Sequence, residues 1–475
     1  MQARIRARMS GPTAPAPFSA PILAGPLRGA VWRLAWPVIL STLLHNGFGV
    51  IDMFWVGRLN DPAAQGAMGV ALFVLIFNFA LVVVHSVGAL SLVSQTVGAG
   101  RSAELPDLAR QMLLYAVLAG LAATAFWLVG LDPILRFMQL SPAEMVHAQN
   151  YLHVLFLGIV LLFVMPVIES IFRAVGDTRT PLAMEAIALA CQLVLNPLLI
   201  LGWGPFPAWG TFGAGVATLF SRLLAVAFGL WKLQGGRLGL PISLFVPTSL
   251  KPELWWKAIQ IGLPQATNVA FFALVYTIIL RIVAQLVPGF GEGYVEATRA
   301  ALGIGIRGVE TLSFSVAFGF QQATATVVGQ NLGNRNPERA EQGALVALSM
   351  AVAVALGFSL IFGLFPGPLA RIFNGNYQVW TLAAEYIRIV AYCQVFQAAE
   401  IALIGVFTGS GNTLPPMFIT VPLTAARIPA AYLLALKLGW GASGIFWAVC
   451  ASAIVKGILM VLWFRRGRWK TYRVV

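Results

Sequence analysis

The chain of 475 residues is 59% hydrophobic and only 10% charged, with a mean hydropathy of +0.82. These few polar residues could not cover the surface of a soluble fold of this length. The composition therefore excludes a soluble protein and indicates a polytopic membrane protein. The net charge of +14 would suggest nucleic acid as a partner of a soluble chain. Here the basic residues lie at the ends of apolar segments, where they set topology and meet anionic lipid headgroups. We therefore expect membrane lipids, and no nucleic acid, as partners.

Cysteine and histidine give no sign of a metal or redox site. The three cysteines lie inside apolar runs and the four histidines are scattered, so we predict neither disulfides nor metal ligands. No GxxxxGK[ST] motif occurs, and we expect no cofactor and no ATP-driven step. Near the N-terminus a proline-rich stretch from Pro12 to Pro26 stands where a cleavable signal peptide would have its apolar core.

Apolar segments long enough to cross a bilayer follow one another along the whole chain. A crossing helix needs about 20 apolar residues. The sequence therefore predicts an all-α polytopic membrane protein with twelve transmembrane helices. The predicted spans are residues 32–57, 66–99, 108–130, 148–173, 181–203, 212–232, 255–287, 296–330, 342–365, 380–409, 416–436 and 441–464.

The distribution of lysine and arginine predicts the orientation of the spans. With the N-terminus inside, the inner loops and tails hold most of the basic residues, from Arg4 at one end to Arg473 at the other. The outer connections hold only Arg58, Arg136, Arg299, Arg371 and Lys437. We therefore expect both termini in the cytoplasm.

The two halves of the chain repeat. LVSQTVGAGR (92–101) after the second span matches VVGQNLGNR (327–335) after the eighth, so that Gln330 follows Gln95 by 235 positions. FRAVGDTRTP (172–181) matches FTGSGNTLPP (407–416) with the same separation. Because each half has an even number of spans, both halves cross the membrane in the same sense. This predicts two six-helix lobes related by a parallel internal repeat, an arrangement typical of secondary transporters.

The repeat also predicts the organisation of the chain. We expect a flexible cytoplasmic N-terminal tail, an N-lobe with spans one to six, a cytoplasmic linker, a C-lobe with spans seven to twelve and a basic cytoplasmic tail. Their ranges are 1–30, 31–233, 234–253, 254–465 and 466–475. In the repeated loops we expect glycines to supply the left-handed conformation of tight helix ends. These glycines are Gly98, Gly176, Gly333 and Gly411.

Asp52 is the leading candidate for a functional residue. It is the one carboxylate of the first span, and a charge inside a membrane normally faces a protein interior or a water-filled cavity. Desolvation there favours the protonated form, which makes reversible protonation plausible. Pro37 lets this span bend, and His45 lies two helical turns before Asp52, about 10 Å away on the same face. The alternative is that Asp52 lies at the outer interface and simply reaches water.

Neutral polar residues in other spans could complete a site with Asp52. Gln192 and Asn196 share one face of the fifth span, and Asn78 and His85 share one face of the second. Such side chains could form a hydrogen-bonded site or merely join neighbouring helices, and both interpretations stay open.

Charged residues elsewhere in the spans are harder to assign. Arg307 and Glu310 are three residues apart in the eighth span and can pair, either in a cavity or as a structural bridge. Arg281 and Glu400 are isolated and receive no role. Two pairs near span ends are predicted to be structural: Glu169 with Arg173, and Glu385 with Arg388.

Several motifs together resemble the multidrug and toxic compound extrusion (MATE) family from the first span to the last. They are IDMFWVGRL, FRAVGDTRTPL followed by LNPLLILG, GAGVATL, and GIRGVETLSFSVAFGFQQATATVVGQNLG. The resemblance implies a bundle of two six-helix lobes around a cavity, in a prokaryotic plasma membrane. It also implies export of organic cations and other amphipathic compounds in exchange for protons or sodium ions.

The resemblance assigns residues as well. It implies that Asp52 is the family's first-span acid and that Pro37 bends this span as in the DinF-like branch. It further implies that Gln192 and Asn196 complete the N-lobe site and that Thr218 holds the matching position of span six.

The sequence also departs from the family's pattern. Asn196 stands where the archaeal type has a second carboxylate, and His45 replaces an expected amide. Span seven lacks the acid of the NorM-like branch (residues 271–273), whereas Arg307 and Glu310 fit the DinF-like pattern. The departures favour protons over sodium ions.

Taken together, these features predict a secondary active antiporter that is no enzyme and works as a monomer. Its substrates would be small amphipathic or cationic molecules, with Asp52 coupling transport to protons or, as the second option, sodium. The predicted cavity-lining residues are His45, Asn78, Gln192, Asn196, Thr218, Arg307 and Glu310. One rival is a flippase for lipid-linked compounds, which would expect a strongly cationic cavity. Another is an intramembrane enzyme, for which we find no nucleophile–base pair and no metal cluster.

Overall fold

The computed structural model describes residues 18–138, 140–236, 249–286, 291 and 293–474. Within these ranges the chain is helical and contains no strand. Ten helices are long and apolar enough to cross a membrane, and there are twelve spans when each of two bent helix pairs counts as one. This confirms the predicted all-α fold and the predicted segments. Helices suit the membrane because they satisfy every backbone N–H and C=O within the segment.

The first six spans form the N-lobe. A short helix α2 (Ala20–Leu23) precedes them, and the fourth span consists of two helices. The spans are α3 (Leu27–Gly57), α4 (Pro62–Gly98), η1 (Ser102–Glu104) with α5 (Leu105–Phe137), α6 (Pro142–Leu157) with α7 (Ile159–Val175), α8 (Arg179–Ile200) and α9 (Gly210–Gln234).

The last six spans form the C-lobe. Two of them contain a π-helical turn, and an extra surface helix, α14, precedes the span that is broken in two. The elements are α10 (Pro252–Val283), α11 (Tyr294–Gly303), η2 (Ile304–Val309), α12 (Glu310–Gly333), α13 (Pro337–Leu364), α14 (Pro366–Phe373), α15 (Tyr377–Ala391), α16 (Gln394–Ser410), α17 (Leu414–Ala425), α18 (Arg427–Tyr432), η3 (Leu433–Lys437), α19 (Ala442–Arg465) and η4 (Arg468–Thr471).

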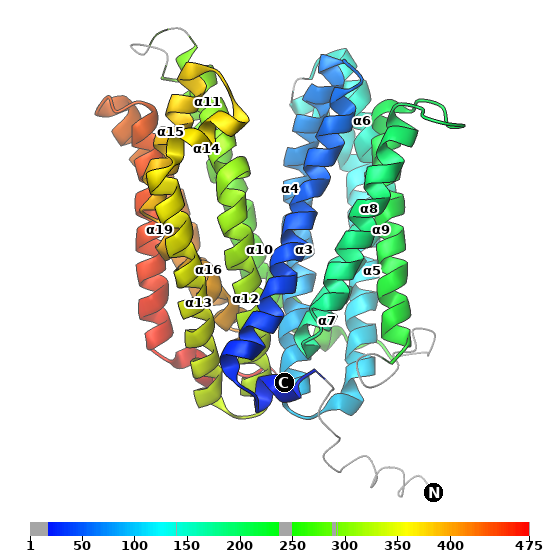
Figure 1. Ribbon diagram of the computed structural model, residues 1–475. Coiled ribbons are helices and arrows are strands. Elements are labelled where there is room, and N and C mark those ends of the chain that lie inside the picture. The colour runs from blue at the N-terminus through cyan, green and yellow to red at the C-terminus, as the bar shows by residue number, and fades with distance from the viewer. Residues whose placement is uncertain (1–17, 139, 237–248, 287–290, 292, 475) are drawn as a thin grey trace, which may run out of the picture.

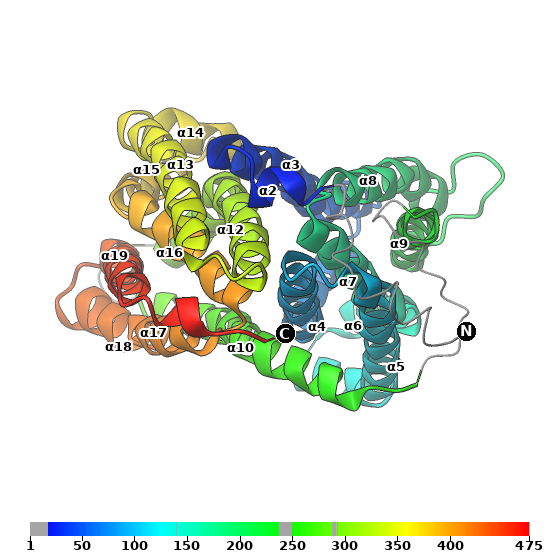
Figure 2. The same ribbon diagram turned by 90° about the horizontal axis from the view of Figure 1, so that it is seen from below.

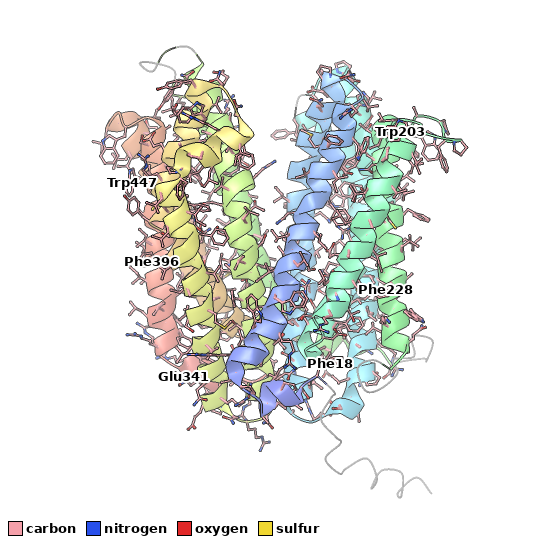
Figure 3. All side chains as sticks on the ribbon, in the orientation of Figure 1. Phe18, Trp203, Phe228, Glu341, Phe396 and Trp447 are labelled. Carbon is pink, nitrogen blue, oxygen red and sulfur yellow. The ribbon has the colours of Figure 1, made fainter. Side chains whose placement is uncertain are left out.

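The two lobes stand side by side (Figures 1 and 2). Their helices come together at the end of the bundle that holds Phe18 and the C-terminal residues, and they lie apart at the opposite end, near Trp203 (Figures 1 and 3). We call these the termini end and the far end. Each lobe has its own packed core, with buried aromatic residues such as Trp127 and Phe156 in the N-lobe and Tyr386 and Phe446 in the C-lobe.

Glycines let the lobes meet at the termini end. A Cβ on Gly98 would lie 1.9 Å from the carbonyl oxygen of Gln330, and one on Gly333 would lie 2.2 Å from that of Gln95. The prediction that Gly98 and Gly333 adopt the left-handed conformation was wrong. The positive φ angles occur two positions later, at 71° in Gly100 and 57° in Arg335. Gly98 and Gly333 instead permit close packing of α4 against α12.

The other repeated loop follows the prediction. Gly176 and Gly411 end α7 and α16 with φ angles of 101° and 81°, in the left-handed region. Two residues on, Thr178 donates to the carbonyl of Arg33 at 3.3 Å. Pro37 has no N–H, so this carbonyl has lost its partner within helix α3. The loop thus replaces a hydrogen bond that the proline removes.

Residues 18–30 and 466–474, which belong to the two predicted tails, include helices and buried side chains. The expected tail 1–30 and linker 234–253 lie partly outside the described residues, at 1–17 and 237–248. Residues 18–30, however, include α2 and the first residues of α3, and Arg339 donates to the carbonyls of Ile22 (3.2 Å) and Gly25. In the tail 466–475, Trp469 is buried and stacks on Phe464. Apolar burial therefore fixes parts of both predicted tails.

Candidate functional site

Asp52 lies inside the N-lobe with four hydrogen-bond donors around it. Only 4% of the residue is exposed. Its Oδ1 accepts from the side-chain amides of Gln192 and, at 2.8 Å, Asn196. Its Oδ2 accepts from the hydroxyls of Tyr151 at 3.3 Å and Thr218 at 3.5 Å. We call these five residues the Asp52 cluster. Because Asp52 is buried among these side chains, the alternative of an acid reaching water at the interface does not describe this structure.

Four helices supply the cluster. Gln192 and Asn196 come from one face of α8, as their spacing predicts, and Thr218 comes from α9. Tyr151, on α6, was missed by the sequence analysis. Its ring is in the N-lobe core, and a buried tyrosine hydroxyl usually needs a partner, which is the one signal that could have drawn attention to it. The 53° bend between α6 and α7 sets the direction in which α6 approaches Asp52.

The Asp52 cluster has unused acceptors. The Oε1 of Gln192 and the Oδ1 of Asn196 are buried and accept no hydrogen bond from any described residue. Both residues are 0% exposed. A buried amide oxygen without a hydrogen-bond partner destabilises the folded protein. Such an oxygen is also a suitable ligand for a hard cation. No group of three or more His, Cys, Asp and Glu side chains among the described residues could hold a metal ion.

Other predicted residues lie outside the cluster. His45 bonds to Glu185 instead, at 3.0 Å between Nδ1 and Oε1. Asn78 accepts from the indole N–H of Trp127 at 3.4 Å, and His85 bonds to the carbonyl of Leu81 at 2.8 Å. The second-span pair therefore joins the local packing and does not approach Asp52, because α4 turns that face toward α5.

Arg307 and Glu310 do not pair with each other among the described contacts. Arg307 lies in the π-helical turn η2, whose wider i to i+5 bonding takes residues three apart off a common face. Arg307 is exposed, and Glu310 is half-buried with Arg427 and Lys456 as its electrostatic neighbours. The expected pairing was therefore wrong.

The C-lobe has an ion pair that the sequence analysis did not assign. Lys456 bonds to Glu400 at 3.1 Å, and Thr420 donates to the same carboxylate oxygen at 3.4 Å. Of the two pairs predicted near span ends, Glu169–Arg173 forms at 2.8 Å. Glu385 accepts from Ser443 instead of pairing with Arg388.

Two lobes of six spans, with at least one buried carboxylate in each, are those of a multi-pass membrane protein. A family model described as MatE matches residues 37–198 and 266–433, one segment in each lobe. The chain belongs to the MatE family. Its members are transporters and not enzymes, which confirms the predicted family and the predicted absence of enzymatic activity.

Relatives and solved structures agree with this assignment. The chain is 29% identical over 460 residues to a probable multidrug resistance protein NorM of Thermotoga maritima, covering 94% of both chains. It is 24% identical over 369 residues to an FAD transporter of Shewanella oneidensis, covering 78% of this chain and 79% of that one. A solved structure described as an outward-facing multidrug resistance MATE family transporter has a TM-score of 0.85 at 22% identity, over 96% of this chain and 99% of that one. At this identity the structural likeness concerns the fold alone.

Proposed function

We propose that this transporter exports small amphipathic or cationic organic compounds in exchange for protons, with Asp52 as the coupling residue. When Asp52 is ionised, the amides of Gln192 and Asn196 and the hydroxyls of Tyr151 and Thr218 stabilise its charge. A proton on Asp52 removes that charge and weakens the hydrogen bonds that join α6, α8 and α9 to α3. Helix α3 also contacts the C-lobe, because Asn46 donates to Ser315 at 3.2 Å. The movement of α3 would therefore change the arrangement of the lobes.

The observation that carries this proposal is the burial of Asp52 without a cationic partner. Its four hydrogen-bond partners are neutral. A buried carboxylate lacking a paired cation gains or loses a proton more readily than one held in an ion pair. That property suits a group that exchanges an ion during each transport cycle.

Sodium is the second coupling ion to consider. The free amide oxygens of Gln192 and Asn196 lie beside the Asp52 carboxylate, and three oxygen ligands could begin a sodium site. We propose protons as the first option, because Asn196 stands where the archaeal type has a second carboxylate, and because Arg307 and Glu310 of span eight resemble the DinF-like pattern.

We also propose the membrane placement predicted by the basic residues. The termini end would face the cytoplasm and the far end the outside of a prokaryotic plasma membrane. The protein would act as a monomer, with lobes at 31–233 and 254–465 and lipids as its surroundings. In this placement the structure would be outward-facing, since the lobes meet at the termini end (Figure 1).

Efflux from proteoliposomes tests the proposal. A fluorescent organic cation would be loaded, and its export measured under a proton gradient and, separately, a sodium gradient. We expect proton-driven export by the wild type and its loss in Asp52→Asn. The matched control is Glu104→Gln, which removes the charge of an acid whose side chain is 58% exposed. Export by Asp52→Asn equal to that of the control would overturn the role of Asp52, and sodium-driven export would change the coupling ion.

A second candidate substrate class is anionic amphiphiles. It is favoured by the cations within the C-lobe, Arg427 and Lys456, both 7% exposed, and by similarity to the FAD transporter. If neither gradient drives export of an organic cation, the same vesicles loaded with a flavin nucleotide or a lipid-linked anion would decide between the classes.

A further inference from the structure

A second polar cluster lies in the N-lobe, closer to the termini end than Asp52. Glu185 accepts from Arg222 at 3.1 Å and bonds to His45 at 3.0 Å. Behind this triad, Glu169 and Arg173 form an ion pair at 2.8 Å. We call these five residues the His45 cluster. It is not explained by the role proposed for Asp52.

Three helices contribute to both clusters. On α3, His45 is seven residues from Asp52, and on α8, Glu185 is seven residues from Gln192. Seven residues are two helical turns, about 10 Å. On α9, which runs in the opposite direction, Arg222 follows Thr218 by four residues. The two clusters are thus successive layers of the same three helices, near enough for the charge of one to act on the other.

His45 is the member of its cluster whose side chain is exposed enough to exchange a proton with the surroundings. Its side chain is 50% exposed, whereas those of Glu185 and Arg222 are 5% and 10% exposed. Two acids balance two arginines, so the cluster is neutral while the imidazole is neutral. The exposed part of the imidazole can meet water, because polar groups within a membrane protein face an aqueous cavity more readily than lipid.

The C-lobe shows which part of this arrangement is shared. At the repeat separation of 235 residues, Glu400 is the C-lobe equivalent of Met165, and Thr420 is the equivalent of Glu185. In the N-lobe, Arg222 of the lobe's last span contacts Met165 at 3.5 Å as well as Glu185. In the C-lobe, Lys456 of the last span contacts Glu400, to which Thr420 donates. In each lobe, therefore, a cation of the last span pairs with a carboxylate at the same place. The acid is Glu185 in the N-lobe, where the C-lobe has Thr420, and Glu400 in the C-lobe, where the N-lobe has Met165.

The histidine has no counterpart in the C-lobe. His45 lies eight residues after Pro37, and the residue eight after the equivalent Pro264 is Phe272. The ion pair is thus a common element of both lobes, and the exposed imidazole is an addition specific to the N-lobe.

We propose that His45 is a second proton-binding site of the N-lobe, which adds a proton to the neutral His45 cluster and thereby acts on Asp52. This inference rests on the proposed proton coupling. The charged groups around the imidazole are Glu185 on α8, Arg222 on α9, and Glu169 and Arg173 on α7. Helix α12 faces this level of α3 with neutral groups, such as Ser315 bonded to Asn46. A proton on His45 makes the cluster positive and favours the ionised form of Asp52 two turns away, so the two sites compete for protons.

Titration of the histidines by nitrogen-15 NMR in nanodiscs tests the site without transport. The chain has four histidines, and His45→Gln identifies the signal of His45. We expect this signal to change from that of the neutral to that of the protonated imidazole as the pH is lowered. Its midpoint should move in the same direction in Glu185→Gln and in Asp52→Asn, since each removes a negative charge. At about 10 Å the second shift should be about 0.3 to 1 pH unit. The signal of His147, which bonds to Asp61, is the internal control.

The outcomes separate this inference from the proposed function. An imidazole of His45 that does not titrate, or a midpoint unchanged by Asp52→Asn, overturns the inference. In proteoliposomes, the pH profile of proton-driven export by His45→Gln should be displaced from that of the wild type, because the positive charge that competes with Asp52 for protons is absent while Asp52 itself still binds a proton. His153→Gln is the matched control. A pH profile of His45→Gln identical to that of His153→Gln also overturns the inference. Absence of proton-driven export by the wild type refutes the proposed function, and the NMR titration then still decides whether His45 binds a proton.

Discussion

Gln95 and Gln330, which occupy equivalent positions of the two halves, each donate across the boundary between the lobes. The amide of Gln95 on α4 donates to the carbonyls of Gly409 and Ser410 at the end of α16, both at 3.0 Å. The amide of Gln330 on α12 donates to the carbonyl of Ala174 at the end of α7, at 2.7 Å. Both glutamines are buried. The internal repeat thus forms a reciprocal pair of bonds that holds the termini end closed.

Replacing either glutamine should favour separation of the lobes at the termini end. Gln95→Leu and Gln330→Leu each leave buried carbonyls without a donor when the lobes are together, at a cost of about 1–3 kcal/mol. The closed population should fall by about 5- to 150-fold relative to the open one. Distances between spin labels on α5 and α13 would measure this. An unchanged distance distribution in the double variant would contradict the assigned closure.

Adding a methyl group at the contact of α4 with α12 should prevent closure by a different cause. Gly98→Ala and Gly333→Ala place a Cβ within about 2 Å of backbone carbonyl oxygens of the opposite helix, and backbone cannot yield as a flexible side chain does. We expect the same change in label distances and at least a tenfold loss of transport. Gly357→Ala is the control, because that helical glycine has nothing within 4 Å of its Cβ position.

The hydrogen bond from Thr178 to the carbonyl of Arg33 should contribute to the free energy of unfolding only while Pro37 is present. Thr178→Val leaves this carbonyl without its donor and should lower the free energy of unfolding by about 1 kcal/mol. In a Pro37→Ala background, residue 37 regains an N–H that can bond to the same carbonyl within α3. A double-mutant cycle of melting temperatures in detergent should therefore show coupling of about 0.5 kcal/mol or more. Additive effects of the two substitutions would show that the loop does not compensate for the proline.

Asp61 should contribute stability that depends on pH. It caps the N-terminus of α4, outside the spans. The backbone N–H of Ala63, first of all, and then that of Ala64 and the side chain of His147 hold the pKa of Asp61 below its usual value. The bonded form is the ionised one, so the contribution is present above the ordinary pKa of about 3.9 and is lost as the pH falls through the lower folded value. Melting temperatures of Asp61→Ala and the wild type should differ at pH 6, and the difference should become smaller as the pH falls below about 3.9. A difference as large at pH 3 as at pH 6 would contradict this.

The elements were predictable because membrane crossing imposes length and composition on each segment. The spacing of Gln192 and Asn196 was also sufficient to place them on one face of α8. The approach of Tyr151 was not predictable, because it depends on the packing of α6 and on the bend before α7. The pairing of His45 with Glu185 likewise depends on which turn of α8 lies against α3. Local spacing misled at Arg307 and Glu310, where a π-helical turn changes the periodicity.

The last described residues link the lobes directly. Trp469 is anchored in the C-lobe core, whereas the N–H of Val474 donates to the side chain of Gln95 in the N-lobe at 3.0 Å and its carbonyl accepts from Lys257 at 3.2 Å. Figure 2 shows this segment running from α19 to the middle of the molecule. Five residues of extended chain reach about 17 Å at most. The segment therefore limits how far the lobes can separate at this end while Val474 stays bonded to Gln95. A larger separation requires this hydrogen bond to break first. The breaking of the bond then becomes a step of the transport cycle.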